Sequence, residues 1–153
     1  MAASFLQRGG GWVLGQGVLM LAVALLAIVF HGHWTKLAIV VGAVLLFVGG
    51  AVGLAGAIVL GRNLTPFPKP IDQSPLVQQG VYALMRHPLY TSVVLAAVGW
   101  ALLWQSWPAL AAALVLVPFL DAKASQEERW LMEKSPEYAE YQKRVRRFIP
   151  WVY

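Results

Sequence analysis

Two short polar segments of this chain carry ionisable side chains directly beside its long apolar runs. The first, Gly80–Tyr90 (GVYALMRHPLY), contains Arg86 and His87 and leads straight into an apolar run. The second is the pair Glu127 and Glu128, which follows the last apolar run. Ionisable groups at a membrane boundary are costly and tend to be kept there for a purpose. Together the two segments indicate an active site at the membrane surface.

The composition places the chain among integral membrane proteins. Of its 153 residues, 59% are hydrophobic and 12% are charged, whereas soluble domains carry about 25% charged residues. Asp, Glu, Lys and Arg are absent from 9–35, 37–61 and 88–120. A helix needs about 20 such residues to cross the hydrocarbon core. The sequence therefore predicts a single all-α membrane domain over residues 1–153.

Four membrane-spanning helices are expected. As one helix, the run 88–120 would rise about 50 Å, which is too long for a hydrocarbon core of about 30 Å. Its middle, Trp104–Pro108 (WQSWP), places polar residues and a helix breaker between aromatics that favour the interface, so it predicts a tight hairpin. The last helix should continue past Asp121 and Lys123 into the headgroup layer. The expected spans are about 10–30, 37–60, 89–104 and 107–125.

The first apolar run follows Arg8 and so has the outline of a signal peptide. Trp12–Phe30 is nevertheless longer than the usual apolar region of about 7–15 residues, and no small-x-small cleavage site follows it. A retained span is therefore favoured.

The basic residues predict the orientation of the helices. With four spans, Arg8, the loop 61–88 and the tail lie on one side of the membrane, and only Lys36 lies on the other. Because basic residues stay in the cytoplasm, both termini and both polar segments are expected there, in the inner membrane if the chain is bacterial. The basic tail should face anionic lipid. A nucleic-acid partner is not expected, because the chain has no soluble basic domain.

The second span is rich in glycine, and Gly49 and Gly53 have the small-xxx-small spacing that lets helices approach closely. Packing within the bundle is favoured over the alternative, a homodimer through this span. The loop 61–88 contains four prolines between 66 and 75 and should run over the cytoplasmic surface.

A cytoplasmic tail helix is expected over 135–148. Ser135 and Pro136 resemble an N-cap followed by proline at the first helical position. Four apolar side chains then form one stripe at helical spacing, which is expected to dock on the bundle or the bilayer. The stripe comprises Tyr138, Tyr141, Val145 and Phe148.

No metal site is predicted. His31 and His33 are close in sequence, but they lie at the outer membrane face without an acidic partner. The chain has no cysteine, which excludes disulfides, thiolate catalysis and cysteine-based metal sites.

The order of the motifs resembles that of the membrane-embedded methyltransferases. This family includes isoprenylcysteine carboxyl methyltransferase and, more distantly, phosphatidylethanolamine and other phospholipid methyltransferases. Its pattern, approximately G-x-Y-x-x-x-R-H-P-x-Y-x-G, is matched at 80–92, and E-E-x-x-L is matched at 127–131 after a helical hairpin. The resemblance covers about 61–151. Ser92 stands where the family usually has glycine, which could shift a close contact with the cofactor.

The resemblance implies S-adenosylmethionine as the methyl donor, bound in the cytoplasmic mouth of the bundle. Glu128 could pair with the ammonium of the donor, and Tyr82, His87 and Tyr90 offer hydrogen bonds and stacking surfaces. Pro88 begins a helix whose free N–H groups could meet the carboxylate of the donor. These five residues are the expected cofactor-binding set.

Arg86 and Glu127 are the expected catalytic residues, which would organise the methyl acceptor. Arginine could hold a carboxylate acceptor in line with the methyl group. An amine acceptor would instead need a proton acceptor, for which Glu127 or His87 would serve. The acceptor is expected to be lipid-like or a small hydrophobic molecule that enters from the bilayer. The alternatives are a non-catalytic membrane adaptor of the same fold and a small transporter subunit.

Overall fold

Helices make up most of the computed structural model, which describes residues 4–71 and 74–153. Within these ranges the structure contains helices and turns, and the single β-bridge joins Met85 to Arg146. The prediction of an all-α membrane bundle is confirmed. The α-helices are α1 (Gly10–Val29), α2 (Lys36–Leu60), α3 (Pro88–Leu103), α4 (Trp107–Lys134) and α5 (Tyr138–Arg144), with short 3₁₀ turns at Gly61–Asn63 and Gly80–Ala83.

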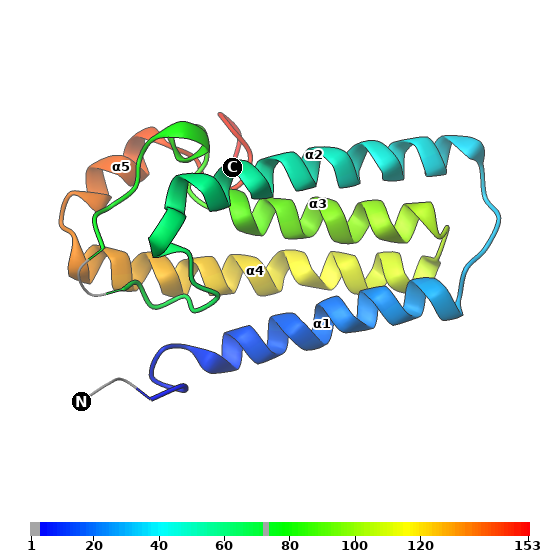
Figure 1. Ribbon diagram of the computed structural model, residues 1–153, viewed down its shortest axis with the longest axis horizontal. Coiled ribbons are helices and arrows are strands. Elements are labelled where there is room, and N and C mark those ends of the chain that lie inside the picture. Colours follow the sequence, from blue (N-terminus) through cyan, green and yellow to red (C-terminus); the bar gives the residue numbers. More distant parts are fainter. Residues whose placement is uncertain (1–3, 72–73) are drawn as a thin grey trace.

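The four long helices lie side by side (Figure 1). Helix α3 packs between α2 and α4, and α1 packs on α4 and α3. Helices α1, α2 and α4 are long and apolar enough to cross a membrane, and α3 is a shorter apolar helix of 16 residues. Large apolar side chains point away from the bundle, and Phe47 on α2 is 78% exposed. This exterior suits a hydrocarbon solvent.

Local capping groups set the helix ends on one side of the bundle. Thr35 Oγ1 accepts from the Ala38 N–H at 3.2 Å at the start of α2. The α3–α4 turn passes through Gln105, which has a left-handed φ of 52°. The next residue, Ser106, is the N-cap of α4, and its hydroxyl donates to the Leu26 carbonyl of α1 at 3.0 Å. The turn is thereby attached to α1.

Glycines bring α2 and α3 into backbone contact. A Cβ on Gly42 would lie 2.7 Å from the Gly99 carbonyl oxygen, and a Cβ on Gly99 would lie 2.7 Å from the Gly42 carbonyl oxygen. A Cβ on Gly53 would lie 2.8 Å from the Ser92 hydroxyl oxygen. Only residues without side chains fit at such distances, so this small-residue face of α2 is used for packing within the chain.

Replacing Gly42 by Val should destabilise the bundle, because the new side chain would meet backbone atoms of Gly99 and Leu103 within 3 Å. Overpacking of this kind costs about 1–3 kcal/mol. The measurement is thermal unfolding in detergent micelles. Gly50→Val is the matched control, since a Cβ there meets nothing within 4 Å. Equal melting temperatures for the two variants would contradict the packing described.

The tail helix is shorter than the expected 135–148. Helix α5 ends at Arg144, and Val145 takes an extended conformation. The reason is a competing pairing, because the N–H groups of Arg86 and His87 donate to the carbonyls of Arg146 and Arg147 at 2.8 and 3.0 Å. The tail leaves the helix to make these bonds. Of the predicted apolar stripe, Tyr138 and Tyr141 lie on α5, and both are buried.

Candidate active site

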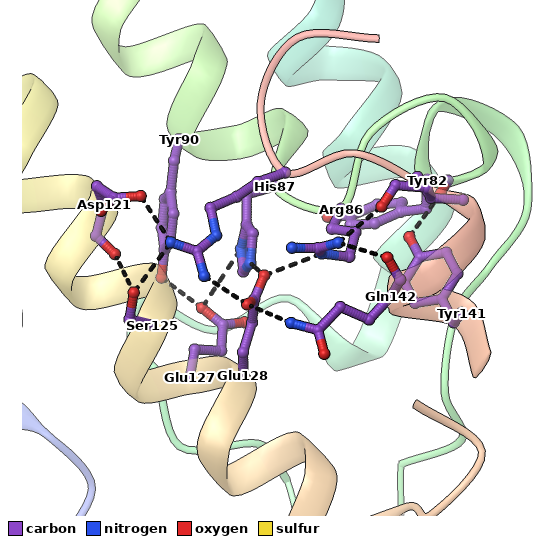
Figure 2. A network of polar contacts seen from close by, with 12 residues as sticks. Tyr82, Arg86, His87, Tyr90, Asp121, Ser125, Glu127, Glu128, Tyr141 and Gln142 are labelled. Carbon is purple, nitrogen blue, oxygen red and sulfur yellow. Dashed lines mark hydrogen bonds and ion pairs between the residues drawn. The ribbon is translucent and has the colours of Figure 1, made fainter. Parts of the chain in front are cut away.

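The two polar segments meet at one end of the bundle. The α3–α4 hairpin is antiparallel, so the residues just before α3 lie beside the last turns of α4. Figure 2 shows Arg86 and His87 pointing toward Glu127 and Glu128. The loop between α2 and α3 and helix α5 lie at the same end in Figure 1.

Glu128 is the centre of this network. Its side chain is 2% exposed, and both carboxylate oxygens are occupied by groups of the chain itself. Oε1 lies 2.9 Å from Arg86 Nε and 3.0 Å from His87 Nε2, and Oε2 accepts from Arg147 at 2.7 Å and from Gln142 at 3.2 Å. A carboxylate with four donors is held firmly as an anion.

Arg86 connects the start of α3 to the tail. Besides Glu128, its guanidinium donates to the carbonyls of Gln142 and Val145 at 3.0 and 2.7 Å. These two carbonyls lie at the C-terminal end of α5, where helices leave carbonyl groups without partners. Arg86 therefore caps α5, and its side chain is only 8% exposed.

Arg147 is a member of the network that the sequence did not predict. It binds Glu128 and also donates to Asp121 Oδ1 at 2.6 Å and to Ser125 Oγ at 2.9 Å. Burial alone would lower the pKa of Arg147, but its hydrogen bonds to Glu128 and Asp121 raise that pKa above its usual value. The tail was expected to face lipid with its basic residues, and for Arg147 this is wrong. Four basic residues within 143–147 look alike in sequence, and only the long-range contacts separate them.

Glu127 has different surroundings from its neighbour. It accepts a hydrogen bond of 2.6 Å from the Tyr90 hydroxyl, lies 3.9 Å from His87 Nδ1, and is 26% exposed. The His87 and Tyr90 rings stack with centroids 5.2 Å apart and planes at 3°. Because Glu128 is ionised, His87 Nε2 is best placed to donate to it, which in the neutral ring leaves Nδ1 as an acceptor facing Glu127.

A pocket opens beside Glu127, with a cavity volume of about 120 Å³ inside a wider opening of about 900 Å³. The loop after α2 covers the pocket, because Lys134 of α4 donates to the Ser74 carbonyl of this loop at 2.7 Å. Five of the expected site residues line it: Tyr82, Arg86, His87, Tyr90 and Glu127.

The other two expected site residues, Pro88 and Glu128, do not line this pocket. Pro88 is fully buried at the start of α3, where its ring suits the first helical position. The N–H of Tyr90 in the first turn is already bound by the His87 carbonyl. Ser92 also lies away from the pocket, against Gly53, and its hydroxyl donates to the Leu89 carbonyl at 2.7 Å. The replacement of the family glycine is thus located at a helix–helix contact.

The loop and α5 add pocket residues that the motifs did not indicate. Tyr138 and Tyr141 both line it, and the Tyr141 hydroxyl donates to the Tyr82 carbonyl at 2.5 Å. The Tyr138 hydroxyl is buried and has no partner among the described residues. Burial raises the pKa of Tyr82, Tyr138 and Tyr141, so each stays a neutral hydroxyl at physiological pH.

The described ranges contain no group of three or more side chains that could hold a metal ion. His31 lies at the opposite end of the bundle, where its Nδ1–H donates to the Ile28 carbonyl at 3.0 Å.

The chain is thus an apolar helical bundle of the membrane type, with a buried ion network and an adjoining pocket at one end. Residues 37–138 match the family described as phospholipid methyltransferase. The chain therefore belongs to this family.

Several curated proteins are similar over most of the chain. A rice protein (Oryza sativa subsp. indica) named "Probable protein-S-isoprenylcysteine O-methyltransferase" is 32% identical over 116 residues, which are 73% of this chain and 61% of that protein. "Protein-S-isoprenylcysteine O-methyltransferase B" of Arabidopsis thaliana is 30% identical over 115 residues, or 72% of this chain and 58% of that one. The chain thus spans about three fifths of the length of these relatives.

A third relative has a name of a different kind. "Cobalt-zinc-cadmium resistance protein CzcN" of Cupriavidus metallidurans is 37% identical over 76 residues, which are 49% of this chain and 35% of that protein.

Replacing Glu128 by Ala should unfold or strongly destabilise the α5 end of the bundle, because Arg86 and Arg147 would lose their shared carboxylate. Breaking a buried ion pair by removing one partner costs about 3–5 kcal/mol. The measurement is thermal unfolding in detergent, together with protease sensitivity of the tail. Glu140→Ala is the control, since the Glu140–Lys143 pair is exposed on both sides. A Glu128→Ala protein that melts with the wild type would contradict the central role of this carboxylate.

Proposed function

We propose that the chain is a methyltransferase of the membrane that uses S-adenosylmethionine and methylates a lipid-like or small hydrophobic acceptor at the cytoplasmic face. Membership of the phospholipid methyltransferase family and the names of the relatives support this activity. The observation that carries it is the pocket beside Glu127, which combines one accessible carboxylate with a wall of tyrosines. When bound, the donor supplies an electrophilic methyl group on a sulfonium.

The pocket residues fit the donor chemically. S-adenosylmethionine carries an ammonium, a carboxylate, a sulfonium and an adenine ring. Glu127 offers an anion toward the cationic parts, and its position is fixed by the Tyr90 hydroxyl. The faces of Tyr82, Tyr90 and Tyr138 are suited to a cation or an aromatic base. The buried Tyr138 hydroxyl, which has no partner among the described residues, would gain one from a bound molecule.

The geometry shifts one expected role from Glu128 to Glu127. Glu128 was expected to bind the ammonium of the donor, but its oxygens are taken by four groups of the chain and it does not line the pocket. Glu127 lies one residue earlier on α4 and lines the pocket. We therefore assign donor binding to Glu127 and the positioning of the network to Glu128. His87 would take part through Nδ1, which is the group available for a proton if the acceptor is an amine.

Donor binding tests this assignment. Titration of the purified chain with S-adenosylmethionine or its demethylated product should release heat. Glu127→Gln should weaken the binding of either ligand by about tenfold or more, because a hydrogen bond to a charged group is worth about 1.5–3 kcal/mol. Glu133→Gln, on an exposed face of α4, is the control and should bind normally.

Transfer of labelled methyl into a total lipid extract is the companion assay, and the labelled species identifies the acceptor. No heat with either ligand and no labelled product would overturn the proposed activity and leave a non-catalytic membrane protein of the same fold.

The cytoplasmic orientation has its own test. The chain has no cysteine, so single-cysteine variants report sidedness directly. Lys143→Cys on α5 should react with a membrane-impermeant maleimide only in inside-out vesicles, and His33→Cys between α1 and α2 only in right-side-out vesicles. The physical basis is the concentration of basic residues at the α5 end of the bundle. The reverse labelling pattern would place the pocket on the outer side.

A further inference from the structure

Three basic side chains line the pocket beside Glu127, which we call the donor pocket: Arg86, His87 and Lys134. The Lys134 ammonium donates to three oxygens of the loop after α2, so its three donors are used. The His87 ring has its two nitrogens beside the two glutamates. The Arg86 guanidinium has five N–H donors, and those of Nε and Nη1 are bound within the chain, whereas Nη2 has no partner among the described residues. Arg86 thus keeps unused donors in the pocket wall.

Tyr138 adds a second unused donor to the same wall. It is 1% exposed and lines the pocket, and its hydroxyl has no partner in the part of the chain that the structure describes. Burial raises the pKa of this hydroxyl above its usual value, as do the negative charges of Glu128 and Glu127, while the positive charge of Arg86 acts in the opposite direction. The hydroxyl therefore lies within reach of all three charges and stays a neutral O–H donor. A buried polar group without a partner is costly, which points to a ligand.

The two sides of the donor pocket differ in character. Figure 2 shows Glu127 and Arg86 on the two sides of the His87 ring. His87 Nδ1 lies 3.9 Å from Glu127 Oε2, and His87 Nε2 lies 3.0 Å from the Glu128 oxygen that also accepts from Arg86 at 2.9 Å. One side of the pocket thus presents an accessible carboxylate, and the other presents unused N–H and O–H donors. This pairing is complementary to a molecule that carries both charges at one end.

We infer that Arg86 Nη2 and the Tyr138 hydroxyl form an anion subsite of the donor pocket, which holds the carboxylate at the amino acid end of S-adenosylmethionine while Glu127 holds the ammonium. This inference rests on the proposed methyltransferase function and names how its donor is recognised. The ammonium and the carboxylate of the donor are attached to the same carbon atom, so both reach the pocket wall around His87. A molecule with a lone carboxylate would instead meet the negative charge of Glu127 without compensation.

The subsite changes two roles that the sequence suggested. The first turn of α3 was expected to meet the carboxylate of the donor, but Pro88 does not line the pocket and the Tyr90 N–H is bound by the His87 carbonyl. Arg86 was expected to hold the methyl acceptor. In the subsite it binds the donor, and Tyr138, which no motif indicated, binds with it. Recognition of the donor thereby involves α5 as well as α3 and α4.

Three ligands that differ only at the amino acid end test the subsite. S-adenosylhomocysteine carries both charges, its decarboxylated analogue keeps only the ammonium, and its deaminated analogue keeps only the carboxylate. The purified full chain in micelles should bind each analogue about tenfold or more weaker than S-adenosylhomocysteine, the loss expected for hydrogen bonds to a charged group. Equal affinity for S-adenosylhomocysteine and the decarboxylated analogue would overturn the inference and leave the proposed function intact. No binding of S-adenosylhomocysteine itself would overturn the proposed function.

Substitutions at Tyr138 and Glu127 should give different patterns with these ligands. Tyr138→Phe should weaken the binding of S-adenosylhomocysteine by about tenfold and leave the affinity for the decarboxylated analogue unchanged. Glu127→Gln should weaken the binding of both and leave the affinity for the deaminated analogue unchanged. Tyr141→Phe is the matched control, because its hydroxyl is already bound by the Tyr82 carbonyl, and it should change all three affinities by one common factor. A common factor for Tyr138→Phe as well would show that Tyr138 only supports the fold.

Thermal unfolding of the ligand-free protein is an independent measurement. Tyr138→Phe should melt at or above the temperature of the wild type, because its hydroxyl has no hydrogen bond to lose among the residues described. Tyr141→Phe should melt lower, since it loses the bond to the Tyr82 carbonyl. Saturating S-adenosylhomocysteine should then raise the melting temperature of Tyr138→Phe less than that of the wild type. A ligand-free Tyr138→Phe protein that melts as low as Tyr141→Phe would show that the hydroxyl is already satisfied, and would overturn the subsite.

Discussion

The architecture of the bundle at the end that carries α5 depends on the carboxylate of Glu128. This group receives Arg86 and His87 from the start of α3, Gln142 from α5 and Arg147 from the tail. The start of α3, helix α5 and the tail are thereby fixed around one buried anion of α4. Because two of the donors are arginines, the charge of the carboxylate is well compensated, and the cost of burying it is offset by hydrogen bonds of good geometry. The pocket exists because these segments meet.

Neighbouring positions on one helix give the two glutamates different tasks. Successive residues of an α-helix point about 100° apart, so Glu128 faces the tail while Glu127 faces the pocket. Tyr90 and His87 of the α3 segment reach both of them through one stacked pair of rings. The glycine contact of α2 with α3 and the Ser106 bond to α1 hold the hairpin that carries these residues. A rigid apolar bundle thus positions a polar site at its end.

Much of the site could be predicted because its residues are concentrated in two motifs. Arg86, His87 and Glu127 were identified from two motifs beside apolar runs and from the resemblance of these motifs to the membrane methyltransferases, and the structure brings them together at one pocket. The separate role of Glu128 could not be predicted, because adjacent glutamates are equivalent until the partners of each are known. Arg147 could not be distinguished from the neighbouring basic residues, because only its contacts with Asp121 and Glu128 set it apart. The tail helix was predicted to be longer than it is. The helical spacing of Val145 and Phe148 gives no information on the carbonyls of Arg146 and Arg147, which accept hydrogen bonds from the backbone N–H groups of Arg86 and His87.

The pairing of Arg86 and His87 with Arg146 and Arg147 also orders events during biosynthesis. Residues 146 and 147 leave the ribosome after every membrane helix, so the bundle can insert while the carboxylate of Glu128 still lacks its last arginine. Until then this end of the α3–α4 hairpin carries an incompletely compensated anion. The arrival of the tail joins the first motif to the second around Glu128. A nascent chain in the membrane would therefore have all its membrane helices before the network of Glu128 is complete.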